Sequence, residues 1–120
     1  MERIQRKRTK GFNLQEYSKS LNGLECVIVS RPSKWGNPFL VSELGAKEAV
    51  LRYRECLLNN VMVYRWIDEI QASIEYDRFK WMSENIKTLR GKNLACFCSL
   101  VNKKGEYTPC HADILLELCQ

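Results

Sequence analysis

The chain has no long hydrophobic run, no internal repeat and only one histidine. None of its apolar stretches approaches the roughly 20 residues that a helix needs to cross a bilayer. The basic residues near the start are not followed by the apolar segment of a secretory signal. We therefore expect a soluble, cytoplasmic protein. The single histidine, His111, excludes any mechanism that requires two.

Its size and composition indicate one globular domain over residues 1–120. A hydrophobic fraction of 45% and a charged fraction of 28% exclude an intrinsically disordered chain. No low-complexity linker divides the 120 residues, which suffice for one core. The net charge of +5 is uneven, because residues 1–10 contribute +4 of it. Such a basic segment either binds phosphate or nucleic acid, or is a solvated arm.

The six cysteines fall into two groups. Three lie inside apolar runs, where a free cysteine behaves as a small buried hydrophobe; these are Cys26, Cys56 and Cys119. The other three are Cys96, Cys98 and Cys110. In a cytosolic chain such a cluster favours a metal site or a catalytic site over disulfide bonds.

The hydrophobic pattern predicts strands that alternate with helices. We expect an extended arm or edge strand over 1–9, a loop over 18–23, and strands at 25–30 (buried on both faces) and 93–98. Helices are expected from about residue 45 to 57, over 63–89 in two pieces, and from 110 or 111 to 118. Ile67, Ile70 and Ile74 mark one apolar stripe, which Phe79, Met82, Ile86 and Leu89 continue. The fold class is therefore α/β, a short and mainly parallel sheet flanked by helices (Rossmann-like), with α+β as the alternative.

In such folds, ligands bind beyond the carboxyl ends of the strands. Cys98 ends the second predicted strand, and Cys110 and His111 begin the helix that follows. Together with Cys96 they form a Cys3His set of the kind that holds zinc. On a strand, Cys96 and Cys98 point to the same face. Neighbouring residues 110 and 111 can share one ion only if the helix begins irregularly.

A reactive thiol is the competing interpretation of this cluster. A cysteine at a helix N-terminus has a lowered pKa, so Cys98 or Cys110 is a candidate nucleophile. His111 and Asp113 would then provide acid–base help, with Asp113 as a candidate catalytic residue. A purely structural role for all of these side chains also stays open.

The segment 31–39 (RPSKWGNPF), which follows the first predicted strand, is a candidate ligand-binding loop. Its prolines and glycine exclude regular structure. Cations suit phosphate, and an aromatic face suits a base. The candidate ligand-binding residues here are Arg31, Ser33, Lys34, Trp35 and Asn37. A rigid loop that plugs the core is the alternative.

Four segments together resemble a known family. Residues 4–11 (IQRKRTKG), 30–39 (SRPSKWGNPF), 89–98 (LRGKNLACFC) and 110–116 (CHADILL) are similar to a family of small phage and bacterial domains, domain of unknown function 4326. The resemblance implies that these polar segments form a shared surface. It further implies that Arg6 and Arg8 join Arg31 and Lys34 in one anion-binding pocket, and it implies no reaction.

Two functional hypotheses follow. The first is a small α/β protein that binds a nucleotide or nucleic-acid phosphate. In the catalytic version of this hypothesis, the protein is an enzyme that modifies nucleotides or bases. The second is a non-catalytic, zinc-stabilised binding module, a phage factor that acts on nucleic acid or on a host protein. The two differ in whether folding depends on the metal, because a structural zinc contributes folding free energy.

Overall fold

A three-stranded parallel sheet organises the molecule, which is described from residue 1 to residue 120 by a computed structural model. The strands are β1 (Arg3–Gln5), β2 (Cys26–Ile28) and β3 (Asn93–Cys96), in the order β1-β3-β2. Ile4 and Ile28 both pair with Ala95, one from each side. The predicted α/β class and the role of the N-terminal segment as an edge strand are thus confirmed.

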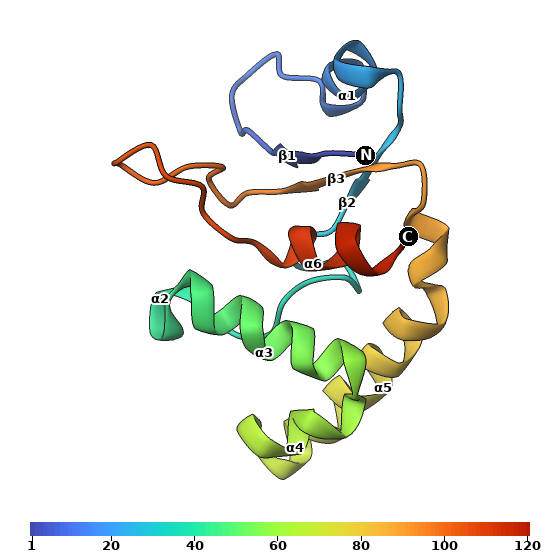
Figure 1. Cartoon of the computed structure of the whole chain (residues 1–120), viewed down its shortest axis with the longest axis vertical. Coiled ribbons are helices and arrows are strands. Elements are labelled where there is room, and N and C mark those ends of the chain that lie inside the picture. The colour runs from blue at the N-terminus through green and yellow to red at the C-terminus, as the bar shows by residue number, and fades with distance from the viewer.

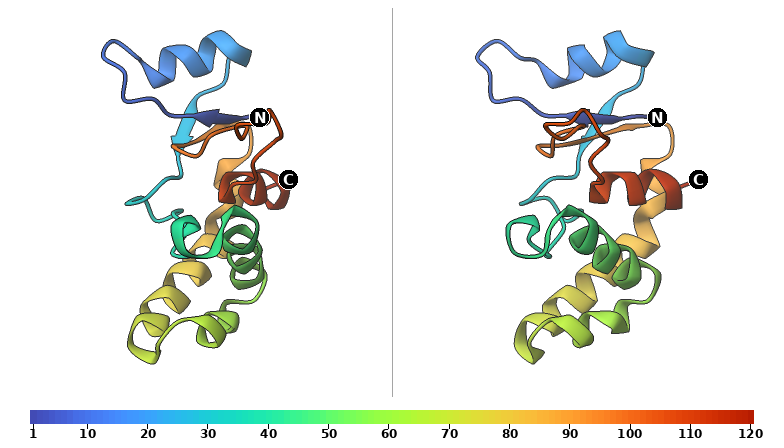
Figure 2. Two further views of the ribbon diagram at one scale, coloured as in Figure 1. Left: turned by 90° about the vertical axis from the view of Figure 1, so that its left-hand side faces the viewer. Right: turned by 60° about the vertical axis from the view of Figure 1, so that its left-hand side comes forward.

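Helices cover both faces of this sheet (Figure 1). Helix α1 (Leu14–Asn22) lies on one face and α6 (His111–Leu118) on the other. Beyond α6 lie α2 (Val41–Leu44), α3 (Ala46–Leu58), α4 (Val63–Trp66) and α5 (Glu69–Asn85), with 3₁₀ turns η1 (Asn60–Met62) and η2 (Ile86–Leu89). Figure 2 shows that these helices extend away from the sheet and give the molecule an elongated shape. No helix combines the length and the apolar character needed to cross a membrane.

The larger core lies on the α6 side of the sheet and joins the sheet to the helical layer. Tyr53 of α3 and Phe79 of α5 meet edge to face there, with ring centroids 5.5 Å apart, and both are fully buried. The Tyr53 hydroxyl donates to the carbonyl of Trp35, which fixes the loop after β2 to α3. A smaller core of Ile4, Cys26 and Ala95 packs toward α1.

Residues 18–22, predicted as a loop, belong to α1 instead. The Asn13 side chain accepts from the Glu16 N–H and starts the helix, and Gly23 ends it with a φ of 79°. The Ser and Asn residues that suggested a loop are used for docking. Ser18 is buried and donates to the Leu24 carbonyl, so its polarity serves a helix that lies against the sheet.

Two burial predictions are also wrong. β2 is an edge strand, and Ile28 is 38% exposed rather than buried on both faces. On α5, Ile70 and Ile74 are 80% and 55% exposed. Phe79 and Met82, which continue the predicted stripe, are fully buried as expected. Ala72 and the ion-paired Glu75 take the buried positions in the first half of the helix.

Asn93 links the start of β3 to α1 and to the N-terminal strand. Its side chain is fully buried, donates to Ser18 Oγ and Asn22 Oδ1 (2.8 Å each), and accepts from the Glu2 N–H (2.9 Å). We predict that Asn93→Ala lowers the free energy of unfolding by about 2–4 kcal/mol, because it strands several buried polar groups. Chemical denaturation would measure the loss.

Asn60→Ala is the control, because the Asn60 side chain makes no hydrogen bond within the chain and its loss should cost less than about 0.5 kcal/mol. Equal stability of the Asn93→Ala variant and the parent would show that this network does not hold α1.

Candidate metal centre

Parallel pairing brings three chain segments to one edge of the sheet. Arg6 and Arg8 follow β1, Ser30 and Arg31 follow β2, and Cys98 follows β3. Hydrogen bonds continue the pairing past the strand ends, from Arg6 N–H to the Cys96 carbonyl and from Val29 N–H to the Ala95 carbonyl. The carboxyl edge of the sheet therefore holds the basic segment and the cysteine segment together, as predicted.

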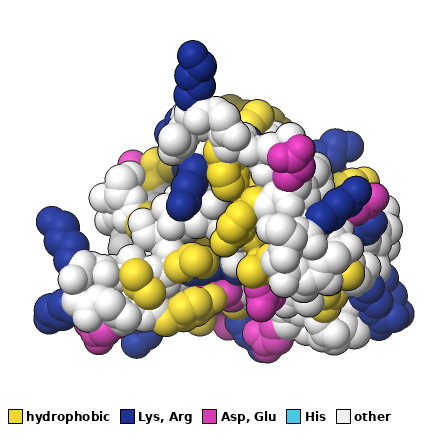
Figure 3. All heavy atoms as spheres, turned by 90° about the horizontal axis from the view of Figure 1, so that it is seen from above, with side chains coloured by type: hydrophobic (Ala, Val, Ile, Leu, Met, Phe, Trp, Pro, Cys, Tyr) yellow, Lys and Arg dark blue, Asp and Glu magenta, His cyan; other side chains and the backbone are white.

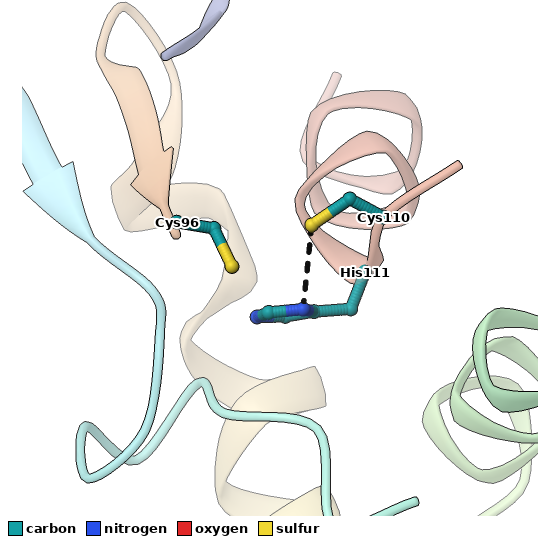
Figure 4. A group of neighbouring side chains, drawn as sticks. All are labelled: Cys96, Cys110 and His111. Atoms are coloured by element: carbon teal, nitrogen blue, oxygen red, sulfur yellow. Dashed lines mark hydrogen bonds between the residues drawn. The ribbon is translucent and has the colours of Figure 1, made fainter. Parts of the chain in front are cut away.

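Three potential metal ligands converge at this edge from two elements. Cys96 ends β3, Cys110 is the N-cap of α6, and His111 is the first residue of α6. Figure 4 shows the Cys96 and Cys110 sulfurs facing the His111 imidazole from the same side of its ring. Their ligand atoms all lie within 4.8 Å of one another, and all three residues are buried. The extended backbone of Cys110 (φ −143°, ψ 154°) is the irregular helix start that lets residues 110 and 111 face one point.

The imidazole of His111 presents its Nδ1 lone pair to this point. Nε2 lies 2.7 Å from the Val29 carbonyl, and a carbonyl only accepts, so Nε2 carries the proton. Nδ1 is then unprotonated and lies 3.6 Å from Cys110 Sγ. Burial lowers the pKa of His111, which keeps the ring neutral near pH 7. A neutral histidine held by a backbone carbonyl through its other nitrogen is the usual arrangement of a metal-binding histidine.

The thiols share one negative charge. Hydrogen bonds from Cys110 and from Cys98 lower the pKa of Cys96. The pKa of Cys110 is raised by its hydrogen bonds to Cys96 and Cys98. The pKa of Cys98 is lowered by Cys110, but the hydrogen bond to Cys96 and burial outweigh this and raise it. Two S–H groups thus stabilise one thiolate, and a cation is the partner that would allow all three to ionise.

Two of the ligand–ligand distances match those around a tetrahedral ion. Metal bonds of about 2.3 Å to sulfur and 2.1 Å to nitrogen require S···S edges of about 3.8 Å and S···N edges of about 3.6 Å. Cys96 and Cys98 Sγ are 3.5 Å apart, and the Cys110 Sγ to His111 Nδ1 distance is 3.6 Å. Cys98 is only half-buried and lies outside the compact group of three. The cluster can therefore hold a metal ion, with Cys98 as its most accessible ligand.

A buried ion pair fixes the loop between these ligands. Arg3, whose side chain is 4% exposed, lies 3.0 Å from Asp113 and also donates to the carbonyls of Ser99 and Leu100. Asp113 accepts from the Cys110 N–H and from the Tyr107 hydroxyl. Asp113, which we considered for acid–base chemistry, is thus occupied in holding Cys110 at the start of α6. Nothing in the sequence pattern around Arg3 or Tyr107 indicated this role.

A cavity of about 420 Å³ opens beside the cluster. Cys96, Cys98, Cys110 and His111 all line it, together with apolar side chains of which Phe39 and Val50 are buried. Arg8 and Arg31 are its only basic lining residues, no carboxylate lines it, and neither arginine forms an ion pair within the chain. The cavity therefore combines soft metal ligands, an apolar wall and two arginines without a carboxylate partner.

Aromatic contacts hold the basic segment over this edge. The guanidinium carbons of Arg6 and Arg8 lie 4.3 and 4.1 Å from the centre of the Phe97 ring. Arg6 also donates to Ser30 Oγ. Figure 3 views the molecule from the α1 side, where the Lys and Arg side chains are spread over the face rather than gathered in one patch. The α1 face therefore carries no single basic patch.

The other predicted ligand-binding residues are divided between the core and a second cavity. Trp35 is buried against Trp81 (ring centroids 4.9 Å apart) and offers no free face to a ligand. Asn37 lines the first cavity, but its amide donates to the Ala49 carbonyl and accepts from the Phe39 N–H. Ser33 and Lys34 line the second cavity, which shares Arg31 with the first. The predicted single pocket is therefore two.

The fold and this site define a small α/β domain with a Cys/His cluster at the carboxyl edge of a parallel sheet. The chain belongs to the family described as Domain of unknown function (DUF4326), whose model matches residues 4–120. The expected family membership is thereby confirmed, whereas a phage or bacterial origin stays a prediction. No curated protein and no solved structure matches the chain.

We predict that Arg3→Met destabilises the protein by about 3 kcal/mol, because it leaves the Asp113 carboxylate without its buried partner. Hydrogen exchange of residues 99–110 should increase at the same time. In the control, Lys92→Met removes the exposed Lys92–Glu25 pair and should cost less than about 1 kcal/mol. If exchange in this loop were unchanged in Arg3→Met, the ion pair would not be what holds Cys110.

Proposed function

We propose that this protein binds a zinc ion through Cys96, Cys98, Cys110 and His111 and a nucleotide in the adjoining cavity. The observation that carries the proposal is the His111 imidazole, which is neutral, anchored by the Val29 carbonyl and directed at two buried thiols. Thiolate and imidazole ligands in tetrahedral geometry favour zinc over harder cations.

The lining of the cavity supports an anionic ligand with an apolar body. Arg8 and Arg31 supply positive charge and the lining includes no carboxylate, so the Cys/His cluster is the only source of negative charge that a phosphate meets there. Phe39, Leu40 and Val50 form an apolar wall that suits a base and sugar. A volume of about 420 Å³ suits a small molecule such as a nucleotide.

Modification of the bound nucleotide or base is the catalytic form of this proposal. Because Asp113 is held by Arg3 and no carboxylate lines the cavity, a carboxylate general base is not available there. Cys98, half-buried on the cavity wall, is the group that would act as nucleophile or leave the metal to open a coordination position. Cys110 also lines the cavity but is only 1% exposed, so Cys98 is the more accessible thiol.

The metal assignment predicts one bound ion per chain. Protein purified without chelator should contain near-stoichiometric zinc, and the Co²⁺ form should show thiolate-to-metal charge transfer in its absorption spectrum. Cys110→Ser and His111→Ala should lose the ion, whereas the control Cys56→Ser, in a buried cysteine of α3, should keep it. An ion retained by both ligand variants would contradict the site.

Metal affinity should fall as the pH falls. The pKa values of Cys98 and Cys110 are raised, so both thiols are protonated near neutral pH and must release their protons when the ion binds. Protons therefore compete with the ion, and binding tightens with increasing pH until both thiols ionise freely. His111 adds little to this dependence, because its lowered pKa leaves it neutral. Competition titration with a chromophoric chelator between pH 6 and 8 would measure the slope.

The nucleotide assignment predicts that Arg8→Ala and Arg31→Ala each weaken binding of a nucleoside monophosphate about tenfold, which corresponds to loss of one charge-assisted contact. Calorimetry would measure the affinity. Lys47→Ala is the control, because Lys47 is an exposed residue of α3 that lines neither cavity, and this variant should bind like the parent. Unchanged affinity in both arginine variants would place the ligand elsewhere.

A zinc-stabilised, non-catalytic module is the second candidate, and the burial of Cys96, Cys110 and His111 favours it. Cys98 separates the two candidates. In a closed structural centre, Cys98→Ser should lower metal affinity and thermal stability as severely as Cys110→Ser. In an open centre, Cys98→Ser should retain Co²⁺ with a weaker charge-transfer band, while the other ligand variants lose it.

A further inference from the structure

A second cavity lies on the other side of the loop that follows β2. Its volume is about 510 Å³, and it is formed between residues 31–38 and the helical layer, where Ile67, Gln71 and Arg78 contribute. Arg31 lines both cavities and is exposed. The two spaces therefore share one lining residue, Arg31, whose guanidinium has no ion pair or hydrogen-bonding partner within the chain.

The second cavity carries positive charge that the chain does not neutralise. Glu75 is the only acidic residue in its lining, and Arg78 already pairs with it. Arg78 also donates to the carbonyls of Lys34 and Gly36, so its role is to fix the loop. This leaves Arg31 and the ammonium group of Lys34, which rests on the Trp81 ring at 4.9 Å without an acidic partner.

The loop between the cavities is held firmly in place. Trp35 is wedged against Trp81, and Asn37 bonds to the loop itself and to α3. A side chain at Gly36 would come within 2.5 Å of Arg31 Cγ, so only glycine allows the loop to pack against the arginine stem. The backbone positions of Arg31 and Lys34 are therefore set before any ligand arrives, which reduces the entropy that the loop loses on binding.

We propose that the second cavity binds a second phosphate group of the ligand whose first phosphate lies near Arg8 and Arg31. This inference rests on the proposed nucleotide site and names its substrate class, a nucleotide with two separated anionic groups. Arg31 bridges the two phosphates, and Lys34 with the Ser33 hydroxyl holds the second one. The second phosphate has two sources: the polyphosphate chain of a nucleoside triphosphate, or the next phosphodiester of a single strand.

Calorimetric titrations with three probes test this inference. The probes are a nucleoside monophosphate, the matching nucleoside triphosphate and a 5′-phosphorylated dinucleotide. We expect the triphosphate or the dinucleotide to bind at least about tenfold more tightly than the monophosphate, as one added charge-assisted contact implies. The probe that gains affinity identifies the source of the second phosphate.

The variant Lys34→Ala tests the contribution of the second cavity separately from that of the first. It should remove most of that gain and leave the affinity for the monophosphate within about twofold, because Lys34 lines only the second cavity. Lys80→Ala, an exposed lysine of α5 outside both linings, is the matched control. The inference is overturned if neither larger probe binds more tightly than the monophosphate, or if Lys34→Ala weakens all three probes equally.

The same titrations distinguish failure of the second cavity from failure of the first. If the parent binds the monophosphate, Arg8→Ala loses this binding and the larger probes bind no more tightly, only the proposed second subsite is contradicted. If the parent protein binds none of the three probes, the nucleotide proposal is contradicted as well.

Discussion

The pairing of β3 with a strand on each side is the constraint on which the rest of the structure depends. Because Ala95 pairs with both Ile4 and Ile28, three segments distant in sequence must leave the sheet at the same edge. The basic residues after β1, the loop after β2 and the cysteines after β3 are thereby brought together. Helix α6 then returns beneath the sheet and adds Cys110 and His111. No single segment of the chain contains this site.

The site could be foreseen from the sequence to the extent that it depends on strand ends. Continuous apolar runs located β2 and β3, and the Cys-Phe-Cys and Cys-His segments stood directly after a strand and at a helix start. Their convergence then follows from parallel topology. The extended conformation of Cys110 and the Arg3–Asp113 pair could not be foreseen. The first is the backbone conformation of a single residue, and the second is a tertiary contact between residues 110 positions apart.

The errors have a common physical origin, which is that polar residues were treated as exposed and apolar residues as buried. Ser18 and Asn22 suggested a loop, yet they are the docking contacts of α1 for Asn93. Ile70 and Ile74 suggested an inward face, yet Glu75 occupies it because Arg78 neutralises the carboxylate. Trp35 was predicted to stack on a ligand, yet its ring packs against Trp81 and anchors the loop. Satisfied pairs of polar groups, invisible to a hydrophobic pattern, decide the first two cases, and aromatic packing decides the third.

The charge of the cluster constrains how a metal and an anion can influence each other. Without a metal, one thiolate is shared among three sulfurs, so the cluster carries a charge of about −1. A divalent ion with three thiolates and a neutral imidazole also carries about −1. Arg8 and Arg31 therefore experience nearly the same long-range field in either state. It follows that any dependence of nucleotide affinity on the metal must come from direct coordination of the ligand or from ordering of the cavity wall around Cys98, and not from attraction at a distance.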